Sequence, residues 1–137
     1  MLDRSIAVGI KGTAVVLALG GLLALAPTAQ AAQSFDSFCA EWMNKLAVRE
    51  HDNVSQVKYT QVGGRVVGTY TGYESVPLRC QSKAKPGAPG VGTLVYNELH
   101  YRKTGDSMAA AKKSSPEVVE KVEVMEIFRF DGSAWKY

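Results

Sequence analysis

Glu98 and His100 are the residues of this 137-residue chain whose types and spacing could support catalysis. They are two positions apart in a segment of alternating polarity, so in a strand both side chains project from the same face. A carboxylate so placed can orient an imidazole, and an imidazole can act as a general base near neutral pH. The alternative is a polar pair on the more solvated face of a sheet, and we favour this simpler interpretation.

The sequence contains none of the motifs typical of nucleophilic, metal-dependent or phosphate-binding enzymes. There is no GxSxG, HExxH or glycine-rich phosphate loop, and the one Gly-Gly pair is typical of a turn. Neither histidine lies at ligand spacing from a cysteine, and no CxxC is present. We therefore predict no metal site and no cofactor.

Cys39 and Cys80 are the two cysteines, and we predict a disulfide between them. Cys39 lies on the apolar stripe of a predicted helix, and Cys80 is in phase with Val76 and Leu78 in a predicted strand. Both side chains should therefore point into one core, and an even cysteine count suits an oxidising compartment. Two buried free thiols are the alternative.

Six tyrosines give the predicted sheet an aromatic population that cross-strand packing explains for the most part. A few of them could instead line a concave site for a small apolar molecule. The candidates for such a site are Tyr59, Tyr70 and Tyr101.

The element expected to organise the core is a helix over residues 34–50. Its apolar residues recur at i, i+3, i+4, i+7, i+8 and i+11, which is one face of a 3.6-residue period. Ser34 is a suitable N-cap, and Asp36 lies in the first turn, where the helix dipole favours an anion. Residues 51–53 are polar and should end the helix. The stripe consists of Phe35, Phe38, Cys39, Trp42, Met43 and Leu46.

The rest of the chain favours strands joined by short turns, which implies antiparallel pairing of successive strands. Gly63-Gly64 predicts a hairpin turn. Gly68 and Gly72 indicate either a bend of the strand or close approach by another element, for which the helix is the candidate. Residues 108–115 could form a helical turn or a loop. The predicted fold is thus α+β, with one N-terminal helix packed on a curved antiparallel sheet of about five to six strands. The predicted strands span residues 54–62, 65–73, 76–83, 91–103, 118–130 and 134–137.

Residues 1–31 have the pattern of a secretory signal peptide. A short basic region precedes the uncharged apolar run 13–26, and Ala29-Gln30-Ala31 offers a cleavage site before Ala32. We expect a periplasmic or secreted product, residues 32–137, that forms one domain with no stable membrane insertion. An uncleaved N-terminal anchor is the alternative. The whole chain has 16 basic and 13 acidic residues, and residues 32–137, which lack Asp3, Arg4 and Lys11, have 14 and 12. This nearly even balance gives no reason to expect nucleic acid as a partner.

The order of the elements and the terminal segment FRFDGSAWKY resemble those of the nuclear-transport-factor-like and cystatin-like domains. That resemblance implies a cone-shaped α+β fold. Ketosteroid-isomerase-like and dehydratase relatives of this shape use a deep acidic residue, a part that Glu98 or Glu126 would take here. Cystatins present a QxVxG hairpin to proteases, and here the segment beginning at Gln61 departs from it, because Gly63 and Arg65 stand where Val and Gly are expected.

The function we predict is that of an exported small binding or interaction domain, for a protein partner or a small apolar ligand. A small-molecule enzyme using an acidic residue or His100 is the first alternative, and a protease inhibitor is the second. Because the two long strands carry apolar residues on both faces, we also expect a homodimer through the backs of the sheets. That interface would use Leu94, Tyr96, Met125 and Ile127, with Glu98, Arg102, Glu123 and Arg129 as its polar rim.

Overall fold

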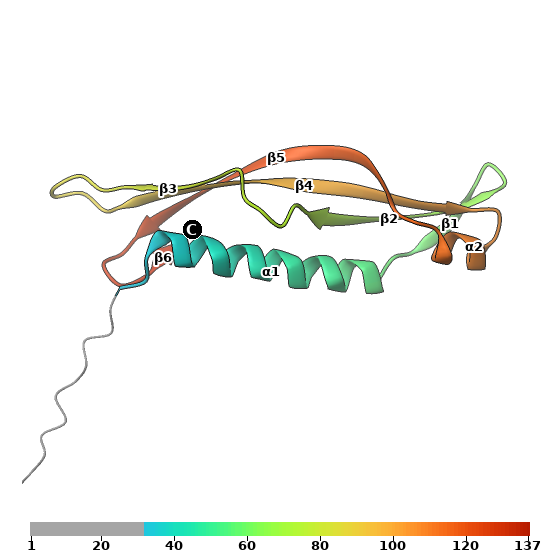
Figure 1. Ribbon diagram of the computed structural model, residues 1–137, viewed down its shortest axis with the longest axis horizontal. Coiled ribbons are helices and arrows are strands. Elements are labelled where there is room, and N and C mark those ends of the chain that lie inside the picture. The colour runs from blue at the N-terminus through green and yellow to red at the C-terminus, as the bar shows by residue number, and fades with distance from the viewer. Residues whose placement is uncertain (1–31) are drawn as a thin grey trace, which may run out of the picture. The chain divides into compact units, whose positions relative to one another are not determined.

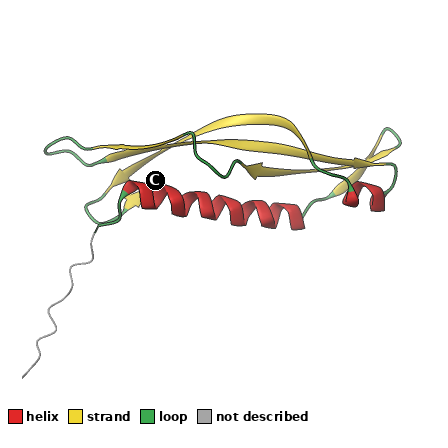
Figure 2. Cartoon of the chain, in the orientation of Figure 1, coloured by secondary structure: helices red, strands yellow, loops and turns green. Residues whose placement is uncertain are grey.

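The computed structural model describes residues 32–137, so the expected signal sequence lies outside the described residues. As predicted, the fold is α+β, with a long helix lying along a curved antiparallel sheet (Figure 1) and a short second helix at one end of it (Figure 2). The elements are α1 (Phe35–Ser55), β1 (Tyr59–Val62), β2 (Arg65–Tyr73), β3 (Arg79–Lys83), β4 (Val91–Gly105), α2 (Met108–Lys113), β5 (Glu117–Phe130) and β6 (Trp135–Lys136).

Helix α1 begins where the sequence predicts and ends later. The Ser34 hydroxyl caps it by accepting a hydrogen bond from the Ser37 backbone N–H at 3.2 Å. The helix continues through residues 51–53, which were predicted to end it, because polar side chains without glycine or proline do not break a helix. It also includes Val54 and Ser55, which the sequence assigns to a strand over residues 54–62, and that strand, β1, begins only at Tyr59. The backbone N–H of Gln56 closes the last turn by donating to the carbonyls of Asp52 and Asn53.

The sheet is not the simple succession of neighbouring strands that the short turns suggest. Its order is β1-β2-β4-β5-β6, and β3 pairs with β4 instead of β2. Strands β2 and β3 lie end to end along one edge of β4, β3 opposite residues 91–95 and β2 opposite residues 98–105. The 15-residue length of β4 makes this possible, because one strand is long enough to pair with two shorter ones.

The sequence predicts that Val91, Val95, Leu99 and Tyr101 form the core face of β4, and this prediction is only partly correct, because of these four only Val95 and Leu99 are buried. Leu94 and Tyr96, predicted to lie on the back of the sheet, belong to the core cluster with Phe128 and the helix stripe, while Val91 is exposed. In the first half of β4 the even-numbered residues are the most buried, and towards its end Leu99 and Gly105 are buried instead. A long strand twists, so the side that faces the core changes along it.

This correction also removes half of the predicted back-to-back dimer surface. Leu94 and Tyr96 are in the core, and only Met125 and Ile127, which are 53% and 54% exposed, remain on the surface. Two of the four apolar residues assigned to the dimer interface are therefore unavailable to a partner.

The predicted disulfide is present. Cys39 and Cys80 are bonded, with their Cα atoms 6.3 Å apart, so the first turns of α1 are tied to β3. On the chain-entropy model a bridge over about 40 residues contributes roughly 4 kcal/mol to stability. Neither helix that the structure describes is long and apolar enough to cross a membrane.

The glycines of β2 mark close approaches, as expected. A Cβ atom at Gly72 would lie 2.8 Å from the carboxyl group of Glu50, and one at Gly68 would lie 2.7 Å from Val57 and from the ring of Tyr59. The end of α1 and the chain that follows it can therefore pass close to β2 only because both positions lack a side chain.

Candidate functional site

Glu98 and His100 lie on one face of β4, as predicted, and the structure adds a third residue to them. His100 Nε2 is 2.8 Å from Glu98 Oε1, and His100 Nδ1 is 2.8 Å from Glu120 Oε2 on β5. The hydrogen bonds that Glu98, and then Glu120, accept from the imidazole raise the pKa of His100 above its ordinary value. Glu120 could have been identified only from the pairing register of β4 and β5, in which it lies opposite His100.

This arrangement is better suited to joining two strands than to general-base catalysis. Both ring nitrogens already contact a carboxylate, so neither is free to accept a proton from a substrate. The raised pKa favours an imidazolium between two anions, which ties β5 to β4 at the point where their register shifts.

Of the three tyrosines predicted to bind a ligand, two form a stacked pair. The ring centroids of Tyr70 and Tyr101 are 4.8 Å apart and the rings are nearly parallel, and they line a groove of about 420 Å³ together with His100 and Glu120. Burial raises the pKa of Tyr70, and so do Tyr101, Glu50 and Tyr59 in that order. Tyr59 does not line this groove, because its ring lies against Gly68.

Glu126, the other acidic candidate, is also engaged within the chain. It accepts hydrogen bonds from the hydroxyl of Tyr96, at 3.1 Å, and from the hydroxyl of Tyr137. Burial, with the nearby Glu126 carboxylate, raises the pKa of Tyr96 to about 12. Among residues 32–137, no group of three or more His, Cys, Asp or Glu side chains is placed to hold a metal ion.

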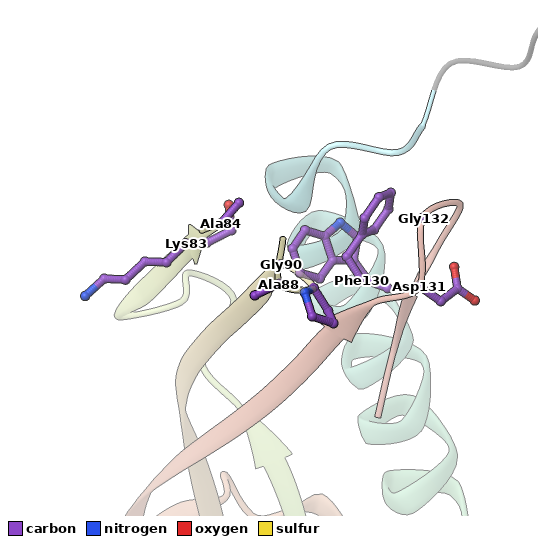
Figure 3. Close-up of a pocket in the computed structure, with 10 residues that line it drawn as sticks. Lys83, Ala84, Ala88, Gly90, Phe130, Asp131 and Gly132 are labelled. Atoms are coloured by element: carbon purple, nitrogen blue, oxygen red, sulfur yellow. The ribbon is translucent and has the colours of Figure 1, made fainter. Parts of the chain in front are cut away.

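A larger groove, about 510 Å³ in volume, lies between the loop 84–90 and the hairpin that joins β5 to β6 (Figure 3). Its lining is mostly apolar and includes two aromatic rings. The sequence marks residues 84–90 only as a loop between strands, and the groove forms because β4 brings this loop beside the chain's last hairpin. The lining residues are Ser82, Lys83, Ala84, Ala88, Pro89, Gly90, Phe130, Asp131, Gly132 and Trp135.

Trp135 is the best-anchored residue of this groove. Its indole N–H donates to the backbone carbonyl of Gln33 at 3.2 Å, and its ring centroid lies 4.6 Å from that of Phe35 and 5.1 Å from that of Phe130. A Cβ atom at Gly90 would lie 3.4 Å from Trp135, so the absence of a side chain there leaves the ring accessible from the loop side. The indole is thus held in place while one side of it faces the groove.

The hairpin beside Trp135 is held by Asp131. Its carboxylate pairs with Lys136 at 2.6 Å and accepts hydrogen bonds from the backbone N–H groups of Ala134 and Ser133. The Lys136 ammonium, followed by these backbone donors, keeps the pKa of Asp131 well below its usual range. The acidic group at the rim is therefore neutralised by its own chain and leaves the groove predominantly apolar.

Comparison with protein-family models, with curated proteins and with solved structures finds no match to this chain.

Proposed function

We propose that this chain is an exported, non-enzymatic binding domain whose site is the groove between the loop 84–90 and the β5–β6 hairpin. The observation that carries the proposal is the groove itself, an open, mainly apolar depression of about 510 Å³ with the anchored ring of Trp135 in its wall. Apolar concave sites of this size, with few polar groups, are typical of small-molecule binding. The ligand we propose is a small apolar molecule or an apolar side chain of a protein partner.

The state of the ionisable groups supports binding over catalysis. Glu98, His100 and Glu120 are bonded to one another, and Glu126 is bonded to two tyrosine hydroxyls. An isomerase or dehydratase of the cone-shaped kind needs an acidic residue or histidine facing the substrate. In this chain, Glu98, His100 and Glu126 would first have to break their hydrogen bonds with other side chains before they could face a substrate.

Export is supported by two independent features. Residues 1–31 have the signal-peptide pattern, and the disulfide between Cys39 and Cys80 is of the kind that persists in oxidising compartments. Together they favour a periplasmic or secreted protein.

The proposal is tested by titrating the purified protein with N-phenyl-1-naphthylamine, a neutral apolar fluorophore. Saturable binding is expected, and Ala88→Phe should abolish it by filling the groove from its exposed loop side. The matched control is Ala40→Phe, which fills a separate depression of about 400 Å³ beside the disulfide and should leave binding unchanged. Unsaturable binding, or equal affinity in wild type and Ala88→Phe, would reject the groove as the site.

A further inference from the structure

Strand β5 has a long outer edge that no strand in residues 32–137 covers. It pairs with β4 from Glu117 to Arg129, apart from Val119 at the register shift, but β6 pairs only with Arg129 and Phe130 on the other side. Residues 117–123 are exposed without interruption, and they include Val118, Val119 and Val122. A strand of this kind presents unpaired backbone groups beside apolar side chains, which is a template for pairing with another strand.

The direction of the backbone groups follows from the ladder. Phe130 donates its N–H to the carbonyl of Gly90 at 2.9 Å, so in this antiparallel register the even-numbered residues 120–128 exchange hydrogen bonds with β4. The odd-numbered residues, Lys121 and Glu123 among them, direct their N–H and C=O groups to the outer edge. The hairpin agrees with this assignment, because Asp131 bonds to Ala134 on the same outer side.

At the opposite edge of the sheet, side chains of α1 form hydrogen bonds with outward backbone groups of β2. There the outward N–H of Tyr73 donates to the Glu50 carboxylate at 2.9 Å, and the outward carbonyl of Thr71 accepts from the Asn53 side chain at 2.9 Å. Both partners come from α1, which lies beside β2. Within residues 32–137 the side-chain hydrogen bonds of β5 all join its side chains, and none reaches the outward backbone groups of residues 121–125.

We propose that the outer edge of β5 pairs antiparallel with the same edge of a second copy, about a two-fold axis at Val122. In this register Lys121 lies opposite Glu123 of the second copy, and the symmetry forms this pair twice. Both members carry outward backbone groups, so the two pairs exchange four backbone hydrogen bonds. Val122 lies opposite its own symmetry mate as a non-hydrogen-bonded pair, in which side chains approach closely.

The neighbouring registers are electrostatically worse. An axis at Lys121 places two lysines opposite each other, and an axis at Glu123 does the same with two glutamates. The register at Val122 therefore has an unlike-charged pair and no directly opposed like-charged pair. A lysine on an edge strand usually discourages pairing, but in this register Lys121 lies opposite a glutamate. The irregularity of β5 near Val119 limits the paired segment to the residues that follow Val119.

The test is the oligomeric state of the purified protein by sedimentation velocity over a concentration series. A monomer–dimer equilibrium is expected, and Glu123→Lys should raise its dissociation constant roughly tenfold, because the symmetry doubles the effect of each like-charged pair. In the wild-type dimer, hydrogen exchange at the amide of Lys121 should be slower than in Glu123→Lys, at a protein concentration where the variant is mostly monomeric. Wild type that sediments as a monomer at every concentration would overturn the proposal.

Exchanging the charges of Lys121 and Glu123 distinguishes the proposed edge-to-edge dimer from dimers that use another surface. Lys121 also contacts Glu74 of its own chain, so the exchange is made in a Glu74→Gln background, which by itself should leave dimerisation intact. Adding Lys121→Glu and Glu123→Lys together should restore the dimer that Glu123→Lys alone weakens. A dimer that is insensitive to Glu123→Lys but dissociated by Ile127→Lys would use the back of the sheet and would contradict the proposal.

Discussion

His100 has a carboxylate at each ring nitrogen, and this arrangement decides how its contribution to stability depends on pH. Glu98 and Glu120 favour the imidazolium in the folded state, so the pKa of His100 is raised on folding. A raised pKa means that the stabilisation is fully present below the unfolded value of about 6.5 and is lost as the pH rises through the folded value.

We therefore expect His100→Gln to lower the melting temperature most near pH 6 and progressively less as the pH rises above the folded pKa. Thermal unfolding of wild type and variant across this range measures the difference. His51→Gln is the control, because that side chain is exposed near the helix end and its nearest carboxylate, that of Asp52, is 3.9 Å away. A His100→Gln deficit that does not change with pH would contradict the ion pairing inferred here.

The alternation of polar and apolar residues was enough to place Glu98 and His100 on one face, because residues two positions apart in a strand lie on the same face. It could not supply Glu120, whose position depends on how β5 aligns with β4. The register of that pair shifts between His100 and Tyr101, and a one-residue change in it would have faced a different residue toward the imidazole.

At the scale of elements, α1 serves both as the cover of the core and as the partner of a strand edge. Its first turns bury Phe35 and Cys39, and its last turns place Glu50 and Asn53 beside the backbone of β2. An N–H group that loses its acceptor in a partly buried place costs about 1–3 kcal/mol.

Glu50→Ala should accordingly lower the free energy of unfolding by about 1–3 kcal/mol, since it leaves the N–H of Tyr73 without its acceptor. Urea denaturation measures this change. Glu41→Ala, at an exposed position of the same helix, should change stability by less than about 0.5 kcal/mol. Equal effects of the two substitutions would show that Glu50 does not protect the edge.

The stripe of α1 was predictable because its period is set by helix geometry alone. The inner face of β4 was not, because Val95, Tyr96 and Asn97 are all buried in the middle of the strand. Asn97 is tolerated there because its amide donates to Glu74 at 2.8 Å, a partner from a turn that no local pattern in the sequence assigns to it.

At the scale of the molecule, the disulfide joins the helix to the sheet. Replacing both Cys39 and Cys80 by alanine should lower the free energy of unfolding by about 4 kcal/mol on the chain-entropy model. Guanidinium denaturation of the double variant, and of wild type with and without reductant, measures it. The reduced wild type is the control, because it lacks the bridge but keeps both cysteine side chains. If the free energy of unfolding falls by less than about 1 kcal/mol in both the double variant and the reduced wild type, the bridge contributes little to stability.

The fold class, the hairpin at Gly63 and the disulfide could be predicted because each depends on local patterning or on which residues are apolar. The order of the strands could not, because β2 and β3 compete for the same edge of β4 and only their lengths and the path of residues 74–78 decide the outcome. The larger groove escaped prediction for the same reason, since its two walls are about 40 residues apart in the chain.

The central place of β4 has a consequence for the order in which the chain can fold as it emerges from a ribosome or a translocation pore. Until residues 91–105 are available, the preceding strands can form only the β1–β2 hairpin, because β3 has no partner other than β4. An isolated hairpin is marginally stable at best in water. The nascent chain should therefore remain without a lasting sheet through its first two-thirds, and a translocation machinery that requires unfolded substrates would meet no barrier there.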